Sequence, residues 1–318
     1  MIVVTGATGN IGKPLTRALA EAGEQVTAVS RHAAAAPPGG RHVVADLAEP
    51  VTLEPALAGA KALFLLLSGD LHAVGANPAD IIGLAAASGV RRVVLLSTLG
   101  VATRPFGTTR MAMRELEDVV RESGLDGAIL RPGGFASNAL WWAESVRSRQ
   151  VVAAPFGDTG VPIVDPADIA DVAAACLLDD RHLGEVYELT GPAVITPREQ
   201  AAALAAVLGS PVAFQELTRE EAKAGMVLSM PAELADDTLD IIGSPTPAEL
   251  RVSPDVERVL GRAPRSFAEW AARNVAAFRR RVALGSSPDT ESGGCRNVRE
   301  HGCACRSVQR ADVEGVGW

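Results

Sequence analysis

Lysine, tyrosine and aromatic side chains in general are scarce in this sequence of 318 residues. It contains three lysines and a single tyrosine, Tyr187, and phenylalanine, tryptophan and tyrosine together make up 4%. The formal net charge is −8, and the basic residues, mostly arginine, are interspersed with acidic ones. Because a nucleic-acid surface needs clustered lysine and arginine, we expect no nucleic-acid partner.

Long apolar runs are missing as well. No run approaches the about 18 residues that a membrane span requires, and an apolar strand that begins at Ile2 leaves no room for a secretory signal peptide. Before residue 285 the only cysteine is Cys176, which fits a reduced compartment and a core position. We therefore expect a cytoplasmic protein that binds no membrane; the sequence leaves open whether it is a monomer or a homodimer.

What the sequence does contain is a glycine pattern at its start. An apolar run, Ile2 to Val4, leads into Gly6, Gly9 and Gly12, and a helical segment, Lys13 to Ala22, follows at once. In such a strand, turn and helix the first glycine allows a sharp turn, the second leaves space for a pyrophosphate, and the third lets the helix pack closely. The spacing alone is a weak signal, and its position between a strand and a helix makes it specific. The residues predicted to bind a dinucleotide here are Gly6, Thr8, Gly9, Asn10, Ile11 and Gly12.

Apolar strands and helical segments then alternate along the chain. Runs of strand type lie at residues 25–30, 42–45, 62–68, 93–96 and 127–131, and a helical segment precedes each of them except 42–45, which follows a loop rich in alanine, proline and glycine at residues 33–40. The run from Ala62 to Leu67 is apolar throughout, which is typical of a strand buried on both faces of a parallel sheet. The alternation predicts an α/β fold with a doubly wound parallel sheet, the Rossmann fold.

Two segments resemble a known family. Thr-Gly-Ala-Thr-Gly-Asn-Ile-Gly at residues 5–12 resembles the glycine motif of the extended and atypical short-chain dehydrogenase/reductases, and Ile-Leu-Arg-Pro-Gly-Gly-Phe at 129–135 resembles a signature of the NmrA-like proteins among them. The resemblance implies one NAD(P)-binding domain over residues 1–284. Its nucleotide-binding core would cover about residues 1–155, and a smaller C-terminal substrate-side lobe would come mostly from 156–284.

Residues 285–318 lie outside this resemblance. They are rich in glycine, serine, arginine and cysteine and have no periodic apolar pattern, so we predict a disordered tail. Cys295, Cys303 and Cys305 with His301 match no regular zinc spacing, and we expect no metal site. One hypothesis is that the tail is translated from an altered reading frame.

The end of the second strand indicates which nucleotide is bound. An acidic residue there binds a free 2′-hydroxyl, whereas an arginine accommodates a 2′-phosphate. This strand ends in Ser30-Arg31, which favours NADP (NADPH), with a solvated arginine as the alternative. The resemblance adds Asp46 and Leu47 near the adenine. Further cofactor contacts are expected at the ends of the next strands, namely at Leu67, Ser68 and Ser97.

The helix expected over residues 109–123 lacks the Tyr-x-x-x-Lys pair with which ordinary short-chain reductases transfer a proton. Tyr187 lies elsewhere and no lysine follows it at that spacing. Many NmrA-like proteins place a lysine or histidine four residues before a helix glutamate; here the glutamate is Glu117 and that position is Met113. The resemblance leaves Ser97 as the catalytic candidate, and the alternative is that it only finishes its strand.

The segment after the sixth strand is predicted to form the substrate side of the site. The resemblance places Pro132, Gly133 and Phe135 beside the nicotinamide. The candidate substrate contacts are Thr98, Phe135, Asn138, Trp141 and Trp142. The adjacent tryptophans would suit an apolar planar substrate by stacking, although core packing of at least one ring is the alternative. Neighbouring helical positions point about 100° apart, so both rings cannot face one pocket.

Three further helices are predicted from their N-terminal capping residues. Asp165 precedes Pro166, and Thr196 and Ser266 are each followed three residues later by a glutamate. The last of these helices is expected to dock on the rest of the domain through an apolar face formed by Phe267, Ala271, Val275 and Phe278.

Together with the resemblance, these residues favour an NADPH-dependent oxidoreductase that transfers hydride to a quinone, enone or carbonyl of an apolar planar small molecule. General acid assistance contributes about 10²–10⁴-fold, so a chain without the usual acid suits a quinone, whose reduced oxygen is a weak base. The alternative is a non-catalytic NADP-binding redox sensor that acts through a protein partner.

Overall fold

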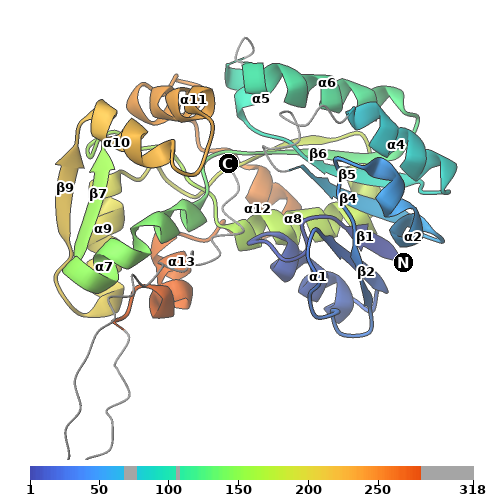
Figure 1. Ribbon diagram of the computed structural model, residues 1–318, viewed down its shortest axis with the longest axis horizontal. Helices are drawn as coiled ribbons and strands as arrows, with labels where there is room; N and C mark the ends of the chain where they lie inside the picture. Colours follow the sequence, from blue (N-terminus) through green and yellow to red (C-terminus); the bar gives the residue numbers. More distant parts are fainter. Residues whose placement is uncertain (68–76, 105–107, 281–318) are drawn as a thin grey trace, which may run out of the picture.

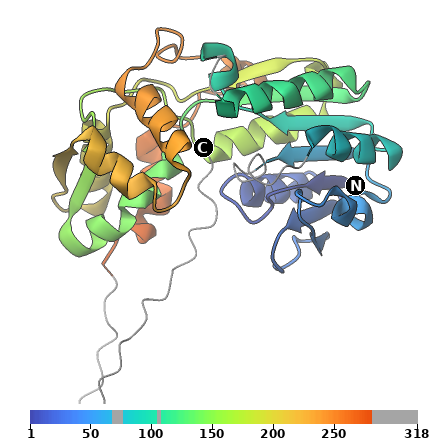
Figure 2. The ribbon, with the colours of Figure 1, turned by 45° about the horizontal axis from the view of Figure 1, so that its top comes forward.

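The structure is a computed structural model that describes residues 1–67, 77–104 and 108–280 (Figure 1). A larger body, which carries the main sheet, and a smaller lobe lie side by side, and they remain so in the turned view of Figure 2. No helix in these ranges is long and apolar enough to cross a membrane. Ser68 and the tail beyond residue 280 lie outside the described residues.

The body is built on one parallel sheet. Its strands are β1 Ile2–Val4, β2 Val26–Ser30, β3 Arg41–Val44, β4 Ala62–Leu66, β5 Arg92–Leu96, β6 Asp126–Pro132 and β8 Val186–Leu189. Their order in the sheet is β3-β2-β1-β4-β5-β6-β8, and every neighbouring pair is parallel. This arrangement confirms the predicted doubly wound sheet. The strand order reverses direction at β1, and ligands bind in the crevice at the carboxyl ends of the strands at such a point.

Helices cover both faces of the sheet (Figure 1). One face carries α1 Gly12–Glu21, α8 Pro166–Leu178 and α12 Asp255–Leu260; the other carries the 3₁₀ turn Pro50–Leu53, α2 Glu54–Leu57, α4 Pro78–Ala87 and α6 Thr108–Glu122. The short helix α5 Gly100–Thr103 follows β5, and a 3₁₀ turn, Asp180–His182, follows α8. Val4 lies in the core between the sheet and α1, α8 and α12, and Val3 lies in the core on the other face of the sheet. The central strands can therefore be apolar throughout.

The lobe combines a small sheet with five helices of the described chain. The strands β7 Val151–Pro155 and β9 Ala213–Leu217 pair in parallel. The helices are α7 Ala143–Arg149, α9 Pro197–Leu208, α10 Arg219–Met226, α11 Ala232–Gly243 and α13 Phe267–Asn274, with 3₁₀ turns at Ala136–Trp142 and Val275–Ala277. Because α8, β8 and α12 belong to the body, the chain passes between body and lobe more than once.

The predicted helix caps are present. The Asp165 side chain accepts a hydrogen bond from the Ala167 N–H at 2.9 Å. Thr196 and Ser266 each form a capping box with the glutamate three residues later. The last helix docks as expected, since Phe267, Ala271 and Phe278 are buried in the core of the lobe. Cys176 also lies in a core position, where burial raises the pKa of its thiol to about 12.

Several elements differ from the sequence expectations. The strand β9 and the helix α12 were not predicted. The tryptophan pair lies in the 3₁₀ turn Ala136–Trp142, not in an α-helix. This turn places Trp141 and Trp142 between the body, which supplies β6, and the lobe, which begins with α7.

Candidate active site

The glycine-rich loop joins β1 to α1 at the carboxyl edge of the sheet. Gly6 has a φ of +63°, a left-handed conformation that glycine adopts without strain. A Cβ on Gly12 would lie 2.1 Å from the Gly6 carbonyl oxygen, so only glycine allows α1 to start this close to the loop. The Leu66 N–H donates to Thr5 Oγ1 at 2.8 Å and fastens β4 to the start of the loop.

The N-terminus of α1 fits the phosphates of a dinucleotide. Its N-cap residue, Ile11, makes no side-chain capping hydrogen bond. No backbone carbonyl in the described part of the chain accepts from the N–H groups of Thr8, Asn10 or Ile11. Unpaired N–H groups at a helix N-terminus, together with the helix dipole, favour an anion.

A hydrogen bond joins this loop to the segment after β6. The side-chain amide of Asn10 donates to Ser137 Oγ at 2.7 Å, across 127 positions of sequence. Ser137 is buried in the 3₁₀ turn that also carries Asn138 and the tryptophan pair. The predicted phosphate-binding residues and the predicted substrate-side residues therefore lie on adjoining elements.

The other predicted nucleotide residues lie along the same edge of the sheet. Arg31 follows β2 directly and is exposed. Asp46 is exposed after β3, and its carboxylate accepts the Ala48 N–H at 2.9 Å. Leu47 and Leu67 are half-buried and pack against the core that lies under α2 and α4. Their contacts to a nucleotide remain predictions.

The buried carboxylate of Glu117 in α6 accepts hydrogen bonds from the polar side chains at the ends of β5 and β6. Glu117 is 0% exposed. Ser97 Oγ donates to it at 2.5 Å, and the Arg131 guanidinium donates to both of its oxygens at 2.9 and 2.5 Å. Arg121 donates at 2.8 Å from one helical turn away. Burial alone would raise the pKa of Glu117, but the hydrogen bonds from Arg131, Ser97 and Arg121 outweigh it and hold that pKa below its usual value.

The bond to Glu117 limits what Ser97 can do. A hydroxyl has one hydrogen, and Ser97 donates it to the carboxylate, so toward a ligand its oxygen is an acceptor. Ser97 is also only 5% exposed. Its neighbour Thr98 is half-buried and accepts the Gly100 N–H at 3.3 Å.

Replacing Ser97 by alanine is expected to slow turnover by less than about tenfold, because a true general acid contributes about 10²–10⁴-fold. The unfolding free energy should fall by about 1 kcal/mol, the usual contribution of a hydrogen bond. Steady-state kinetics and denaturant unfolding of the same preparation measure the two effects. A loss of turnover on the order of 100-fold or more would show instead that Ser97 is the proton donor.

The backbone after β6 turns against two neighbouring segments. The Gly133 N–H donates to the Leu189 carbonyl at 2.9 Å, and the Val164 N–H donates to the Gly134 carbonyl at 2.7 Å. Phe135 is 3% exposed, with its ring in the core shared with α1 and α8. Its side chain therefore supports the loop from within the body, and its contact with cofactor or substrate remains a prediction.

The substrate-side residues differ in their surroundings. Trp141 is 37% exposed, whereas Trp142 packs against the core of the lobe. The two rings thus lie in different environments, as their adjacent positions predicted. The Oδ1 atom of Asn138 is buried and has no hydrogen-bond partner among the described residues. A buried acceptor without a donor is uncommon in native proteins and is accounted for by a ligand or a water molecule.

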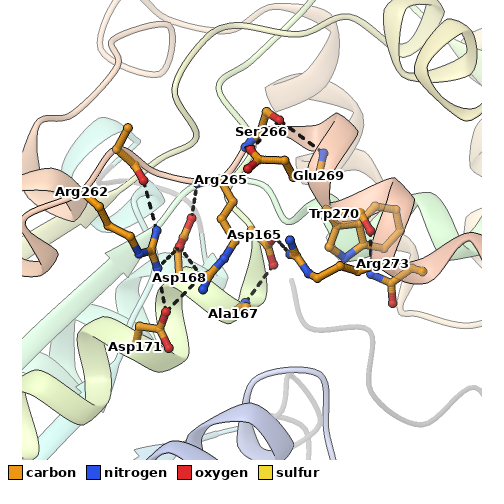
Figure 3. A network of polar contacts seen from close by, with 12 residues as sticks. Asp165, Ala167, Asp168, Asp171, Arg262, Arg265, Ser266, Glu269, Trp270 and Arg273 are labelled. Atoms are coloured by element: carbon orange, nitrogen blue, oxygen red, sulfur yellow. Dashed lines mark hydrogen bonds and ion pairs between the residues drawn. The ribbon is translucent and has the colours of Figure 1, made fainter. Parts of the chain in front are cut away.

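A network of six charged side chains ties the lobe to the body beside the site (Figure 3). Its acids come from the N-cap and the first turns of α8, and its arginines come from the chain before α13 and from the last turn of α13: Asp165, Asp168, Asp171, Arg262, Arg265 and Arg273. Asp168 is 0% exposed and accepts from Arg262 at 2.7 Å and from Arg265 at 2.5 Å. Because Asp165, which caps α8, follows Val164 directly, this network fixes the segment that supports the loop after β6.

Sequence reasoning missed the roles of Glu117 and Asp168. Glu117 lies within the apolar stripe of its helix, beside Met113, Leu116 and Val120, and an acid in such a stripe signals a buried carboxylate. Asp168 lies in the first turn of α8, where the sequence alone suggests only a favourable interaction with the helix dipole. The spacing of three aspartates on one face of α8, matched by three arginines near α13, was the available signal.

Comparison with known proteins places this site in a family. The family described as NAD(P)H-binding matches residues 6–180, which include the glycine-rich loop, Glu117 and the loop after β6. The chain is 38% identical to a (4-alkanoyl-5-oxo-2,5-dihydrofuran-3-yl)methyl phosphate reductase of Streptomyces griseus, over 87% of this chain and 99% of the relative. It is 34% identical to an NAD(P)H azoreductase of Xenophilus azovorans, over 87% and 99% of the two chains.

A solved structure is also similar to this chain. The chain matches the NADPH complex of an NADPH-dependent quinone oxidoreductase from Escherichia coli with a TM-score of 0.71 and 26% identity. The match covers 86% of this chain and 99% of the other. The shared part therefore includes the lobe as well as the body.

Proposed function

Since the chain belongs to the NAD(P)H-binding, NmrA-like family of atypical short-chain dehydrogenase/reductases and is an NAD(P)H-dependent oxidoreductase, we propose that it uses NADPH to reduce a quinone, an enone or another conjugated carbonyl of an apolar, planar small molecule. The observation that carries the proposal is the hydrogen bond from Asn10 to Ser137. It joins a loop suited to phosphates to the turn that carries Asn138 and the exposed ring of Trp141.

This chain's own residues would hold the cofactor along the carboxyl edge of the sheet. The N–H groups of Thr8, Asn10 and Ile11 would bind the pyrophosphate, and Arg31 would bind the 2′-phosphate. The backbone from Gly133 to Phe135 would lie beside the nicotinamide, which when bound supplies a hydride. Asn138 would accept a hydrogen bond from the carboxamide or from the substrate.

The absence of a built-in acid favours acceptors whose reduced form is a stabilised anion. The usual tyrosine and lysine are missing, and Ser97 donates its hydrogen to Glu117. A reduced quinone oxygen is phenolic and a weak base. The substrate named for the Streptomyces relative has a ring double bond conjugated with two carbonyl groups, so the anion formed on reduction is also delocalised. We propose that water supplies the proton.

Mixing the purified protein with NADPH and a panel of acceptors tests this function. The panel pairs quinones and alkenes conjugated to two carbonyl groups with saturated ketones of similar size, and the nicotinamide absorbance reports turnover. We expect the conjugated acceptors to react at least about 10²-fold faster than the ketones, which need the missing general acid. Equal rates for both groups would contradict the proposal.

A redox sensor that binds NADPH without using it is the second candidate. Met113 favours it, because the family often places a lysine or histidine at that position, and here the side chain packs against the apolar core under α4 and α6. NADPH binding without turnover across the whole panel would select this candidate.

Replacing Arg31 by alanine is expected to weaken NADPH binding about tenfold, since a guanidinium and a phosphate form charge-assisted hydrogen bonds worth about 1.4 kcal/mol or more. NADH lacks the 2′-phosphate, so its affinity should stay unchanged and serves as the control. Calorimetric titration of both nucleotides measures the effect. Unchanged NADPH affinity would remove Arg31 from the site.

A further inference from the structure

A hollow of about 340 Å³ lies beside the glycine-rich loop, between α1 and the segment that joins β2 to β3. Thr8 of the loop and Ala28, two residues before the end of β2, are among its lining residues. Alanines and prolines of residues 34–38 form one wall. The hollow therefore adjoins the position at which Rossmann folds read the 2′ substituent of the adenosine ribose.

Three cationic or protonatable side chains line this hollow: Lys13, Arg17 and His42. Among the described residues no carboxylate lines it, and residues 33–40, which include the wall, contain no titratable group. Arg17 also pairs with Glu21 at 2.7 Å on the exposed face of α1. Lys13 and Arg17 of α1 are thus the charged groups facing His42 across the hollow.

The remaining neighbours of His42 in the described part of the chain bring no acid toward it. On β2 it meets Ser30 and Ala28, which carry no charge. On β3 the neighbouring Arg41 directs its guanidinium to Thr27 Oγ1 at 3.0 Å and to the Pro55 carbonyl at 2.8 Å, away from the hollow. Since β2 and β3 add no acid, the charged side chains that line the hollow are positive.

The hydrogen bonds of Ser30 determine that Nε2 of the His42 ring carries a hydrogen. Ser30 Oγ donates its single hydrogen to the His32 carbonyl at 2.8 Å. The same oxygen lies 2.8 Å from His42 Nε2 and can therefore only accept, so Nε2 carries a hydrogen. The ring nitrogen left for a ligand in the hollow is Nδ1, which has no hydrogen bond among the described residues. It can donate to an anion only when the ring is protonated.

From this geometry we infer that the hollow holds the 2′-phosphate of NADP and that His42, with Lys13, makes the preference for NADP over NAD depend on pH. The inference rests on the proposed function and adds residues to its 2′-phosphate site. Histidine changes its charge between about pH 5 and 8. At low pH a protonated His42 donates Nδ1–H to the phosphate, and at high pH the neutral ring presents a lone pair there instead.

The test compares the wild type with His42→Gln, whose side-chain amide can still donate to Ser30. Calorimetry gives the dissociation constants of NADP⁺ and NAD⁺ at pH 5.5, 7.0 and 8.5. The phosphate itself titrates near pH 6, and this contribution is the same in both proteins. We expect the wild-type preference for NADP⁺ to exceed that of His42→Gln about tenfold at pH 5.5 and to match it within about twofold at pH 8.5.

His32→Gln is the matched control, because it removes a neighbouring histidine that does not line the hollow. Its preference should follow that of the wild type at each pH. The NAD⁺ affinity of each variant reports whether the fold is intact. Equal preferences for wild type and His42→Gln at every pH, with both nucleotides bound, would overturn this inference alone. Failure of the wild type to bind either nucleotide would overturn the proposed function as well.

Discussion

Replacing Gly12 by alanine should weaken NADPH binding on the order of 100-fold. The added Cβ would lie 2.1 Å from the Gly6 carbonyl oxygen and 2.6 Å from the Ala7 Cα, both backbone atoms, so the loop must move away from α1. The N–H groups of Thr8, Asn10 and Ile11 move with it and no longer converge on one anion. Overpacking costs about 1–3 kcal/mol, so the unfolding free energy should fall as well. Nucleotide titration and denaturant unfolding measure the two losses.

Gly83→Ala provides the control for this change. Gly83 lies inside α4, and nothing lies within 4 Å of a Cβ added there. This variant should bind NADPH like the wild type and gain about 0.5–1 kcal/mol of stability from the better helix propensity of alanine. If Gly12→Ala also bound NADPH with wild-type affinity, the glycine-rich loop would not be the nucleotide site.

Replacing Glu117 by alanine should lower the unfolding free energy by about 3–5 kcal/mol, because it leaves the buried partner of an ion pair without its counter-charge. Arg131 is the partner most affected, since it donates to both oxygens of the carboxylate. Ser97 loses its acceptor at the same time, and its hydroxyl is freed at the end of β5. Chemical denaturation of the purified variant measures the loss. A change below about 1 kcal/mol, the usual result for an exposed ion pair, would contradict this account.

The pH dependence gives a separate check on Glu117. Its pKa is lowered in the folded protein, so the stabilisation is present above the unfolded-state value for glutamate, about 4.3, and is lost as the pH falls through the folded-state value. Glu117→Gln keeps the shape but has no such titration. The difference in stability between wild type and Glu117→Gln should therefore be greatest near neutral pH and shrink in acid. A difference that stays constant down to about pH 3 would rule out this role of the carboxylate.

The parts of the fold that could be predicted are those with a local cause. Residues 93–96 of β5 are apolar because helices cover both faces of the sheet, and that pattern is visible in a few residues. The capped starts at Thr196 and Ser266 are likewise set by residues three positions apart. In contrast, β9 is mostly exposed and shows no apolar alternation, and α12 has only 6 residues, too few for a helical period to stand out.

The site likewise has parts that were predictable from the sequence and parts that were not. The loop Gly6 to Gly12 was predictable because its backbone requirements are local. The bonds that place it depend on pairing between distant segments: Asn10 with Ser137, and Asp168 with Arg265, which lie 127 and 97 positions apart. The residues around each of these side chains indicate at most that a polar or charged partner exists, and they do not specify which residue it is. The same holds for Ser97, whose position at a strand end was predictable but whose hydrogen-bond acceptor, Glu117, was not.

The resulting site separates binding from proton transfer. In the proposed site the glycine-rich loop, Arg31 and the hollow beside His42 would supply the contacts that a phosphorylated nucleotide needs. The end of β5 supplies a serine whose hydrogen is held by a buried carboxylate. A reductase of this kind would choose its substrates by how well the reduced anion is stabilised and would leave protonation to water.

Deuterium transfer most directly tests the claim that NADPH gives its hydride to a conjugated acceptor and that water supplies the proton. The protein would be incubated with NADPH deuterated at the nicotinamide C4 and an alkene conjugated to two carbonyl groups, and the product would be examined by NMR. We expect deuterium on the carbon β to the carbonyl groups, on one face only, and solvent hydrogen on the α carbon. Product without deuterium from either C4-labelled form of NADPH, or no product although NADPH is bound, would contradict the account.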